Sequence, residues 1–299
     1  MRIGIDLGGT KIEAIVLDEN GDVHIRQRVA TPQGDYYGTI KSIKDLVLNI
    51  ESQLQNKNYL SVGIGIPGAI SKATNKIKNA NSVCLIGQDL KSDLTKALNR
   101  PIRLANDADC FALSEATDGA AKGKQVVFGI IIGTGVGGGI VYNGELLQGP
   151  NSITGEWGHN PLPLPSSHEL PGPKCYCGKH GCIETFLSGP GLSNFYYTKT
   201  QQKLDAQQIA QQAMQGNSAA QLVLEQYEDR LARGLAGVIN LLDPHVIVLG
   251  GGLSNIQRIY ENVPKLLSKY VFSDQVDTIL TPAQHGDSSG VRGAAWLWP

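Results

Sequence analysis

The chain has 299 residues, and 26 lysine and arginine residues nearly balance 27 aspartate and glutamate residues, for a formal net charge of -1. This balance excludes the broad positive field that attracts nucleic acid or an anionic membrane, and a hydrophobic share of 41% excludes a disordered or fibrous chain. The length predicts one large domain or two ordinary ones, and the 36 glycines are about 12% of the chain against roughly 7% in soluble proteins.

Three apolar segments with strand spacing come first in the chain, at residues 2–6, 11–17 and 23–29. Gly8-Gly9 and a turn at 18–21 separate them, which predicts an antiparallel meander. A helix is expected over 40–50 and a strand over 61–66. The start of the chain therefore has the order βββαβ.

The same order follows again, with an expected helix at 90–98, a strand at 102–105 and a helix from Asn106 or Asp107 to 121. A second meander is expected at 126–132, 139–142 and 145–147. Because a strand, a glycine turn and a strand recur after about 125 residues, the pattern predicts a duplicated α/β architecture with a cleft between two lobes. The first lobe boundary is placed near Asp107.

The second half begins with an irregular insert, residues 160–182, that holds five prolines. Helices are expected from Ser188 onward, including a long one over 219–242 that leads into a strand at 246–249. The most apolar stretch, 126–142, is interrupted by six glycines and falls short of the roughly 20 residues that span a bilayer. With no leader peptide pattern at Met1, the sequence predicts a cytoplasmic protein without a membrane partner.

The first glycine turn lies in Asp6-Leu-Gly-Gly-Thr-Lys11, between two strands. Bare backbone at Gly8 and Gly9 can cradle phosphate oxygens, Thr10 adds a hydroxyl donor, and Asp6 can hold Mg²⁺ through water. An ordinary hairpin turn is the alternative. The spacing excludes a Walker A loop, because a strand follows where that loop needs a helix.

The second glycine cluster is Gly133-Thr-Gly-Val-Gly-Gly-Gly139. Gly133, Gly135 and Gly138 match the dinucleotide pattern G-x-G-x-x-G, but a strand follows instead of the helix that would hold a pyrophosphate. An NAD-dependent dehydrogenase is therefore disfavoured, and the turn is interpreted as a second phosphate clamp. A third cluster, Gly250 to Gly252, would let a purine and ribose lie against bare backbone.

Three cysteines fall within eight residues, in Cys175-Tyr-Cys177-Gly-Lys-His-Gly-Cys182. In a reducing compartment this spacing indicates a metal site more than disulfides, and three thiolates in one loop suit tetrahedral Zn²⁺. His159 is chosen as the fourth ligand over His180, which would strain to reach the metal from inside the loop. Four protein ligands would make the zinc structural, with unligated thiols as the alternative.

Asn106 and Asp107 follow a strand and begin a helix, where a side chain can be presented at a cleft edge. An ordinary N-cap pair is the alternative. Asp107 could accept the proton of an attacking hydroxyl group, whereas Asp109 should point elsewhere, about 200° further round the helix.

Taken together, these motifs resemble those of the ROK sugar kinases, within the hexokinase and actin-like ATPase superfamily. The resemblance rests on six segments along the chain: D-L-G-G-T-K at Asp6, N-D-A-D at Asn106, I-G-T-G-V-G-G-G at Ile132, G-E-W-G-H at Gly155, C-Y-C-G-K-H-G-C-I-E at Cys175 and V-L-G-G-G-L-S-N at Val248. Within the family the chain is most similar to bacterial manno(fructo)kinases, in K-N-A-N-S at Lys78, E-W-G-H-N-P-L-P at Glu156 and the ending from His285.

The resemblance implies a two-lobed α/β fold, with residues 1–107 plus 288–299 in a small lobe and 108–287 in a large lobe. It implies an ATP- and Mg²⁺-dependent transfer to the 6-hydroxyl of a hexose, first of all fructose, with mannose and glucose also used. N-acetylglucosamine is the alternative sugar, because kinases of that sugar share nearly all these motifs. A ROK repressor is a remote alternative, since it would need a helix-turn-helix ahead of Arg2.

The resemblance also implies roles for single residues, and it leaves the oligomeric state open, including a homodimer. Asp107 matches the catalytic base. The sugar-binding positions are Asn106, Glu156, His159, Glu184, Gly68 and Asn81. The nucleotide positions are Asp6, Gly8, Gly9, Thr10, Lys11, Gly133, Thr134, Gly135, Val136, Gly137, Gly138, Gly139 and Gly251. The structural zinc ligands are His159, Cys175, Cys177 and Cys182.

Overall fold

The computed structural model describes residues 1–54, 59–80 and 82–299, which form two compact units. The first unit comprises Met1–Gly123, Gly144–Thr154 and Asp287–Pro299, and the second comprises Lys124–Asn143 and Gly155–Gly286. Among the described residues, no helix combines the length and apolar character that crossing a membrane requires.

The first unit is built on a five-stranded sheet in the order β3-β2-β1-β4-β7. Its strands are β1 (Arg2–Leu7), β2 (Lys11–Leu17), β3 (Val23–Ala30), β4 (Ser61–Ile66) and β7 (Ile102–Asn106). The strands β1, β2 and β3 form the expected antiparallel meander, whereas β1, β4 and β7 run parallel. The carboxyl ends of three neighbouring strands therefore meet at one edge of this sheet.

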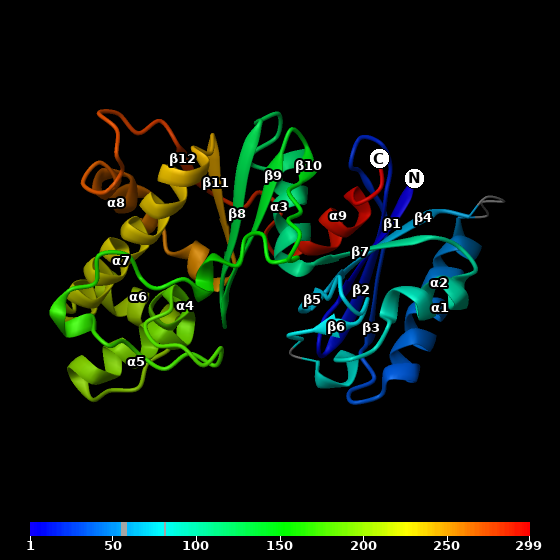
Figure 1. Cartoon of the computed structure of the whole chain (residues 1–299), viewed down its shortest axis with the longest axis horizontal. Helices are drawn as coiled ribbons and strands as arrows, with labels where there is room; N and C mark the ends of the chain where they lie inside the picture. The colour runs from blue at the N-terminus through cyan, green and yellow to red at the C-terminus, as the bar shows by residue number, and fades with distance from the viewer. Residues whose placement is uncertain (55–58, 81) are drawn as a thin grey trace. The chain divides into compact units, whose positions relative to one another are not determined.

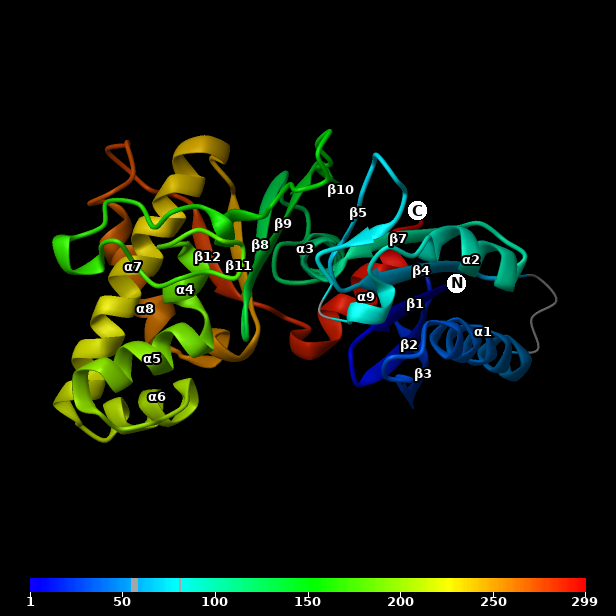
Figure 2. The same cartoon turned by 60° about the horizontal axis from the view of Figure 1, so that its bottom comes forward.

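Helices cover both faces of the first sheet (Figures 1 and 2). They are α1 (Tyr36–Gln53) and α2 (Leu90–Leu98) on one face, and α3 (Asp107–Thr117) and α9 (Ser289–Trp296) on the other. Asp35 and Asp89 cap α1 and α2 by accepting hydrogen bonds from the N–H groups of Gly38 and Ser92. The small strands β5 (Ala69–Ile70), β6 (Ile77–Lys78) and β10 (Glu145–Leu146) and the short helix η1 (Val83–Leu85) complete the unit.

The second unit has a sheet in which β9, β8, β11 and β12 are neighbours in that order. Their bounds are β8 (Val126–Ile132), β9 (Val136–Tyr142), β11 (Val246–Gly250) and β12 (Ile279–Pro282). Five α-helices belong to this unit: α4 (Ile183–Leu187), α5 (Gly189–Thr200), α6 (Ala206–Met214), α7 (Ser218–Leu242) and α8 (Arg258–Leu267). The short helices η2 (Trp157–His159), η3 (Ser167–Glu169), η4 (Gly252–Asn255) and η5 (Gly286–Ser288) lie in connecting segments.

Some elements differ from the sequence expectations. β9 begins at Val136 rather than Gly139, because Gly137 to Gly139 pair with β8, and α3 ends at Thr117 rather than 121. The division of the chain also differs, since α3 and residues 144–154 group with the first unit and not with the second. The physical reason is that α3 packs closely on α9, which itself lies on β1 and β4.

Candidate functional site

In the first unit, three predicted site residues lie at the carboxyl edge of the parallel strands. Asp6 is in β1, Asn106 ends β7, and Asp107 begins α3. The Nδ2 of Asn106 donates to the carbonyl oxygen of Gly68 at 2.8 Å, and its Oδ1 accepts from the N–H of Ala108 at 2.8 Å. Asn106 is thus both a helix cap and a fixed link to the segment that carries Gly68.

The two carboxylates at this edge have perturbed acidity. Burial, and after it the nearby charges of Asp107 and Glu13, raise the pKa of Asp6 to about 6 against the lowering effect of Lys11. Burial also raises the pKa of Asp107, against the opposing effect of a hydrogen bond that its Oδ1 accepts from the N–H of Ala108. Carboxylates whose pKa is raised by desolvation are typical of catalytic sites.

The first glycine turn leaves backbone donors at the surface. The N–H of Gly8 donates to the carbonyl of Lys11, and the hydroxyl of Thr31 donates to the carbonyl of Gly8 at 2.7 Å. Within the described part of the chain, the exposed residues Gly9 and Thr10 have no hydrogen-bond acceptor for their own N–H groups. These two donors suit phosphate oxygens.

Lys11 differs from Gly9 and Thr10 in its surroundings. Its Nζ lies 3.8 Å from Oε2 of the buried Glu13, which also pairs with Arg28 at 2.9 Å. The chain therefore directs this ammonium group along the sheet toward an internal carboxylate. A role for Lys11 in nucleotide binding stays a prediction.

In the second unit, the glycine cluster forms a shorter turn than expected. Gly133 to Gly135 make the turn between β8 and β9, closed by a hydrogen bond from the N–H of Gly133 to the carbonyl of Gly135 at 3.0 Å. Gly137 to Gly139 belong to β9, and a Cβ at Gly138 would meet the carbonyl oxygen of Gly155 at 2.9 Å. The ladder and this close packing account for the later glycines, so the exposed backbone is confined to the turn.

Gly251 has a left-handed conformation at φ +81, and a Cβ there would lie 2.5 Å from the carbonyl oxygen of Ile132. A glycine is thus required for the backbone itself. The proposed place of this residue beside a nucleotide is not tested by that geometry and stays a prediction.

Glu184 joins the glycine turn to the helix α4. Its Oε2 accepts a hydrogen bond from the N–H of Val136 at 2.9 Å, and a Cβ at Gly135 would lie 2.8 Å from the same oxygen. The N–H of Gly189, just after α4, donates to the carbonyl of Gly133 at 2.8 Å. The turn and the helix that carries Glu184 are therefore held as one piece.

His159, Cys175, Cys177 and Cys182 come together in the second unit. Their ligand atoms all lie within 4.8 Å of one another. The Sγ of Cys175 is 3.6 Å from Nδ1 of His159, and the Sγ atoms of Cys177 and Cys182 are 3.6 Å apart. Four ligands about 2.3 Å from a central ion stand about 3.8 Å apart in a tetrahedron, so the donor set fits Zn²⁺. His180 is not part of the cluster.

The second nitrogen of His159 also has a partner. Nε2 lies 2.9 Å from the hydroxyl oxygen of Tyr176, a residue between two of the cysteines. Such a contact orients a ligating imidazole. A sugar contact by His159 would have to displace Tyr176, and this role stays a prediction.

Two residues of this site were missed by the sequence reasoning. Tyr176 stands inside the cysteine motif and could have been noted there, whereas Thr31 lies far from the glycine turn in sequence and has no motif of its own. Glu156 lies just before η2, and Asn81 lies outside the described residues.

The chain is similar to known proteins over its whole length. The profile of the ROK family matches residues 2–299. An N-acetyl-D-glucosamine kinase of Yersinia enterocolitica is 40% identical over 301 residues, covering 99% of both chains. This relative favours the alternative sugar of the sequence analysis over fructose.

Two solved structures have the same fold. One is a ROK hexokinase from Thermus thermophilus, with a TM-score of 0.87 and 30% identity over 99% of this chain and 96% of that one. The other is a ROK family glucokinase from Streptomyces griseus in complex with glucose and AMPPNP, with a TM-score of 0.78 and 27% identity over 99% and 98% of the two chains. The expected α/β, actin-like ATPase fold is confirmed.

Proposed function

The chain belongs to the ROK family of sugar kinases, and we propose that it transfers the γ-phosphoryl group of ATP to the 6-hydroxyl of N-acetyl-D-glucosamine. Identity of 40% to a kinase of that sugar extends over 99% of the chain. The resemblance to fructokinases rests on short segments. N-acetyl-D-glucosamine is therefore the better supported substrate, and fructose becomes the alternative.

The observation that carries a transfer reaction is the placement of Asp107. Its side chain begins α3 and keeps solvent-exposed surface, so a substrate can reach it, while desolvation by the surrounding protein raises its pKa toward the range useful for accepting a proton. The neighbouring Asn106 is held on both sides of its amide. Asp107 would orient the sugar hydroxyl and accept its proton, while Asn106 would present a rigid polar group to the sugar.

The nucleotide would be bound by backbone donors and Mg²⁺. The N–H groups of Gly9 and Thr10 would donate to phosphate oxygens, and Asp6 would hold Mg²⁺ through water. When bound, Mg²⁺ neutralises the charge of the phosphates. In the second unit, the turn at Gly133 to Gly135 would also supply bare backbone that suits phosphate oxygens.

A structural zinc ion is a second part of this proposal. The four donors match a closed tetrahedral site, which leaves no position for a catalytic water molecule. Zinc would fix the insert from which α4 begins, since Cys182 directly precedes Ile183 of α4. Glu184 would thereby be held against the glycine turn.

An ADP-release assay across N-acetyl-D-glucosamine, fructose, mannose and glucose tests the substrate. We expect kcat/KM for N-acetyl-D-glucosamine to exceed the others by roughly 100-fold or more, because a site built for an acetamido group leaves polar groups unpaired with sugars that lack it. A higher kcat/KM for fructose would restore the alternative. Absence of ADP release with all four sugars would contradict the kinase assignment.

A further inference from the structure

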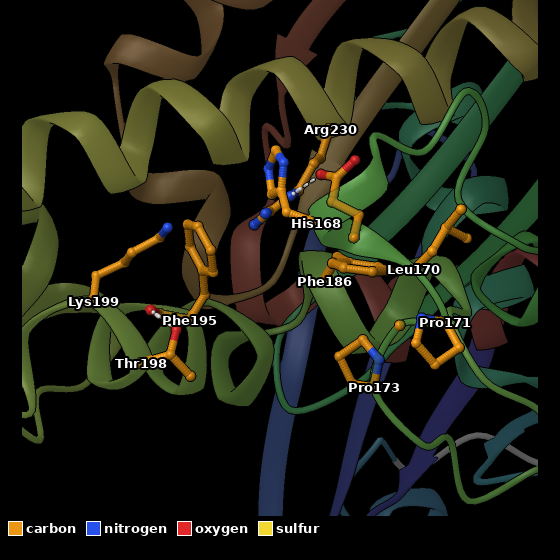
Figure 3. A pocket seen from close by; sticks show the side chains of 11 residues that line it. His168, Leu170, Pro171, Pro173, Phe186, Phe195, Thr198, Lys199 and Arg230 are labelled. Atoms are coloured by element: carbon orange, nitrogen blue, oxygen red, sulfur yellow. Dashed lines mark hydrogen bonds and ion pairs between the residues drawn. The ribbon is translucent and has the colours of Figure 1, made fainter.

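A cavity of about 460 Å³ opens in the second unit, apart from the glycine turn and the cysteine cluster. Its walls come from the loop 168–173 and from α4, α5 and α7 (Figure 3). Most of the lining is apolar, formed by Leu170, Pro171, Pro173, Phe186 and Phe195. The proposed kinase reaction uses none of these residues.

Arg230 of α7 places a guanidinium group in this apolar wall. Its side chain is only 3% exposed, and its carbon Cζ lies 4.0 Å from the ring centroid of Phe195. Figure 3 shows the side chain running from α7 toward Phe195. Nε donates to Oε1 of Glu169 at 2.7 Å, but among the described residues neither Nη atom has a hydrogen-bond acceptor.

The guanidinium group of Arg233, in the same helix, has hydrogen-bond acceptors for both of its Nη atoms. Its Nη1 donates to two backbone carbonyls, at 3.0 and 2.9 Å, and its Nη2 donates to Glu169 at 2.9 Å. Buried guanidinium groups normally find such partners, because leaving their N–H groups unpaired costs free energy. The Nη atoms of Arg230 are not among the fully buried side-chain atoms that lack a partner, so they have accessible surface, and an external acceptor can reach them from the cavity that Arg230 lines.

The charges around the cavity favour an anion. Glu169 is the acidic lining residue, and although burial alone would raise its pKa, hydrogen bonds from Arg233 and Arg230 hold the pKa at about 2. Its negative charge is thus engaged by two guanidinium groups. Lys199 adds a second cation to the lining, with Nζ 5.5 Å from the ring centroid of Phe195.

We propose that this cavity binds a small organic anion with an apolar body. A carboxylate or phosphate group would accept hydrogen bonds from the Nη atoms of Arg230, and the body would pack on Phe186, Phe195 and the prolines. Guanidinium groups bind both anions with two parallel hydrogen bonds. The volume of about 460 Å³ also lies in the usual range of small-molecule sites.

Fluorine NMR on the full-length protein tests the site with fluorobenzoate as the probe and fluorobenzamide as its neutral match. Fluorobenzoate should bind saturably and about fivefold or more tightly than the amide, because only the acid pairs with Arg230. Unlabelled phenyl phosphate should displace it, with phosphate alone much weaker. Equal binding of the acid and the amide, or displacement of the probe by Mg-ATP and sugar, would overturn the proposal.

Two variants locate the binding. Arg230→Lys keeps the positive charge but loses the two Nη donors of the guanidinium group. It should weaken the binding of fluorobenzoate roughly tenfold. Lys199→Glu reverses an exposed charge at the cavity, so it does not threaten folding, and should weaken binding severalfold. The matched control is Lys203→Glu. In the unmodified protein, the ammonium group of Lys203 lies 6.0 Å from the ring centroid of Tyr197, and Lys203 does not line the cavity. An equal effect of the two lysine variants would place the probe elsewhere.

Discussion

Asp107 and Asp109 share a helical turn and a charge, yet only Asp107 is proposed to meet the reacting hydroxyl. Asp107→Asn removes the proton acceptor while it keeps the side-chain shape, so kcat should fall by about 10²- to 10⁴-fold with sugar binding retained. Asp109→Asn makes the same change of charge in the same helix and should leave kcat within a few-fold. Steady-state kinetics with a separate sugar-binding titration measure both. Similar losses in the two variants would show a general effect on the helix instead.

The pH dependence of the reaction follows from the same carboxylates. Burial raises the pKa of Asp107, and burial with the charge of Asp107 raises that of Asp6 to about 6. Both groups act when ionised, and a raised pKa means that the ionised form is lost as the pH falls through the raised value. We expect kcat/KM to decline below about pH 6. If the carboxylates had ordinary pKa values, the same decline would begin near pH 4. A profile flat down to pH 5 would contradict the proposed roles.

Among the elements, sequence patterns predicted those that local chemistry determines. The meander, α2 and α7 follow from the apolar patterns, and Asn106 is a polar residue before a helical pattern, where a cap is expected. The start of β9 is wrong in the prediction because a run of glycines indicates a loop, whereas Gly137 to Gly139 pair with β8. Pairing between segments that are distant in the sequence decides where such a strand begins, and the local sequence carries no signal of it.

The same limit applies to the candidate site. The cysteine motif predicted His159 as the fourth member of the cluster, since spacing alone disfavoured His180. The hydrogen bond from the N–H of Val136 to the carboxylate of Glu184 could not be predicted, because it joins residues 48 positions apart. The open guanidinium of Arg230 was equally hidden, since its sequence context is an ordinary helix.

The packing of α9 against α3 leads to a prediction about stability. Gly293 of α9 faces α3, and a Cβ there would lie 1.6 Å from the carbonyl oxygen of Cys110. Gly293→Ala should therefore destabilise the protein by about 1 to 3 kcal/mol despite its better helix propensity. Gly237 of α7 is the matched control, because its Cβ would meet Pro163 at an ordinary 3.8 Å.

Chemical denaturation of the two glycine variants measures this difference. Gly237→Ala should stabilise the protein by up to about 1 kcal/mol, since alanine favours a helix. Equal free energies of unfolding for Gly293→Ala and Gly237→Ala would contradict the close packing of α9 on α3.

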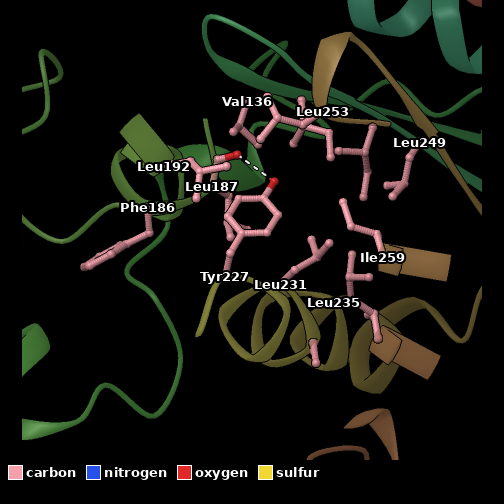
Figure 4. Packing of buried hydrophobic residues seen from close by; sticks show 14 of the residues in the cluster. Val136, Phe186, Leu187, Leu192, Tyr227, Leu231, Leu235, Leu249, Leu253 and Ile259 are labelled. Carbon is pink, nitrogen blue, oxygen red and sulfur yellow. Dashed lines mark hydrogen bonds between the residues drawn. The ribbon is translucent and has the colours of Figure 1, made fainter. Parts of the chain in front are cut away.

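At the scale of the whole molecule, each unit has its own hydrophobic core. One core gathers side chains from the first sheet with α1 and α2, and the other gathers α4 to α8 around β8 and β11. Figure 4 shows part of the second core, where the hydroxyl of Tyr227 donates to the carbonyl of Leu187 at the end of α4. Separate cores allow the units to respond separately to a local perturbation.

Removal of the proposed zinc ion should reveal this independence. The cysteine cluster lies in the second unit, so chelation should speed hydrogen exchange in peptides from the insert 160–182 and α4 and leave peptides from β1 and β4 unchanged. Gly293→Ala should do the reverse, with faster exchange in α3, α9, β1 and β4 of the first unit and none in the second. Mass spectrometry of both samples measures this, after metal analysis has found about one equivalent of zinc per chain. Equal acceleration in both units would show a single cooperative core, and absence of zinc from the purified protein would remove the structural role assigned to it.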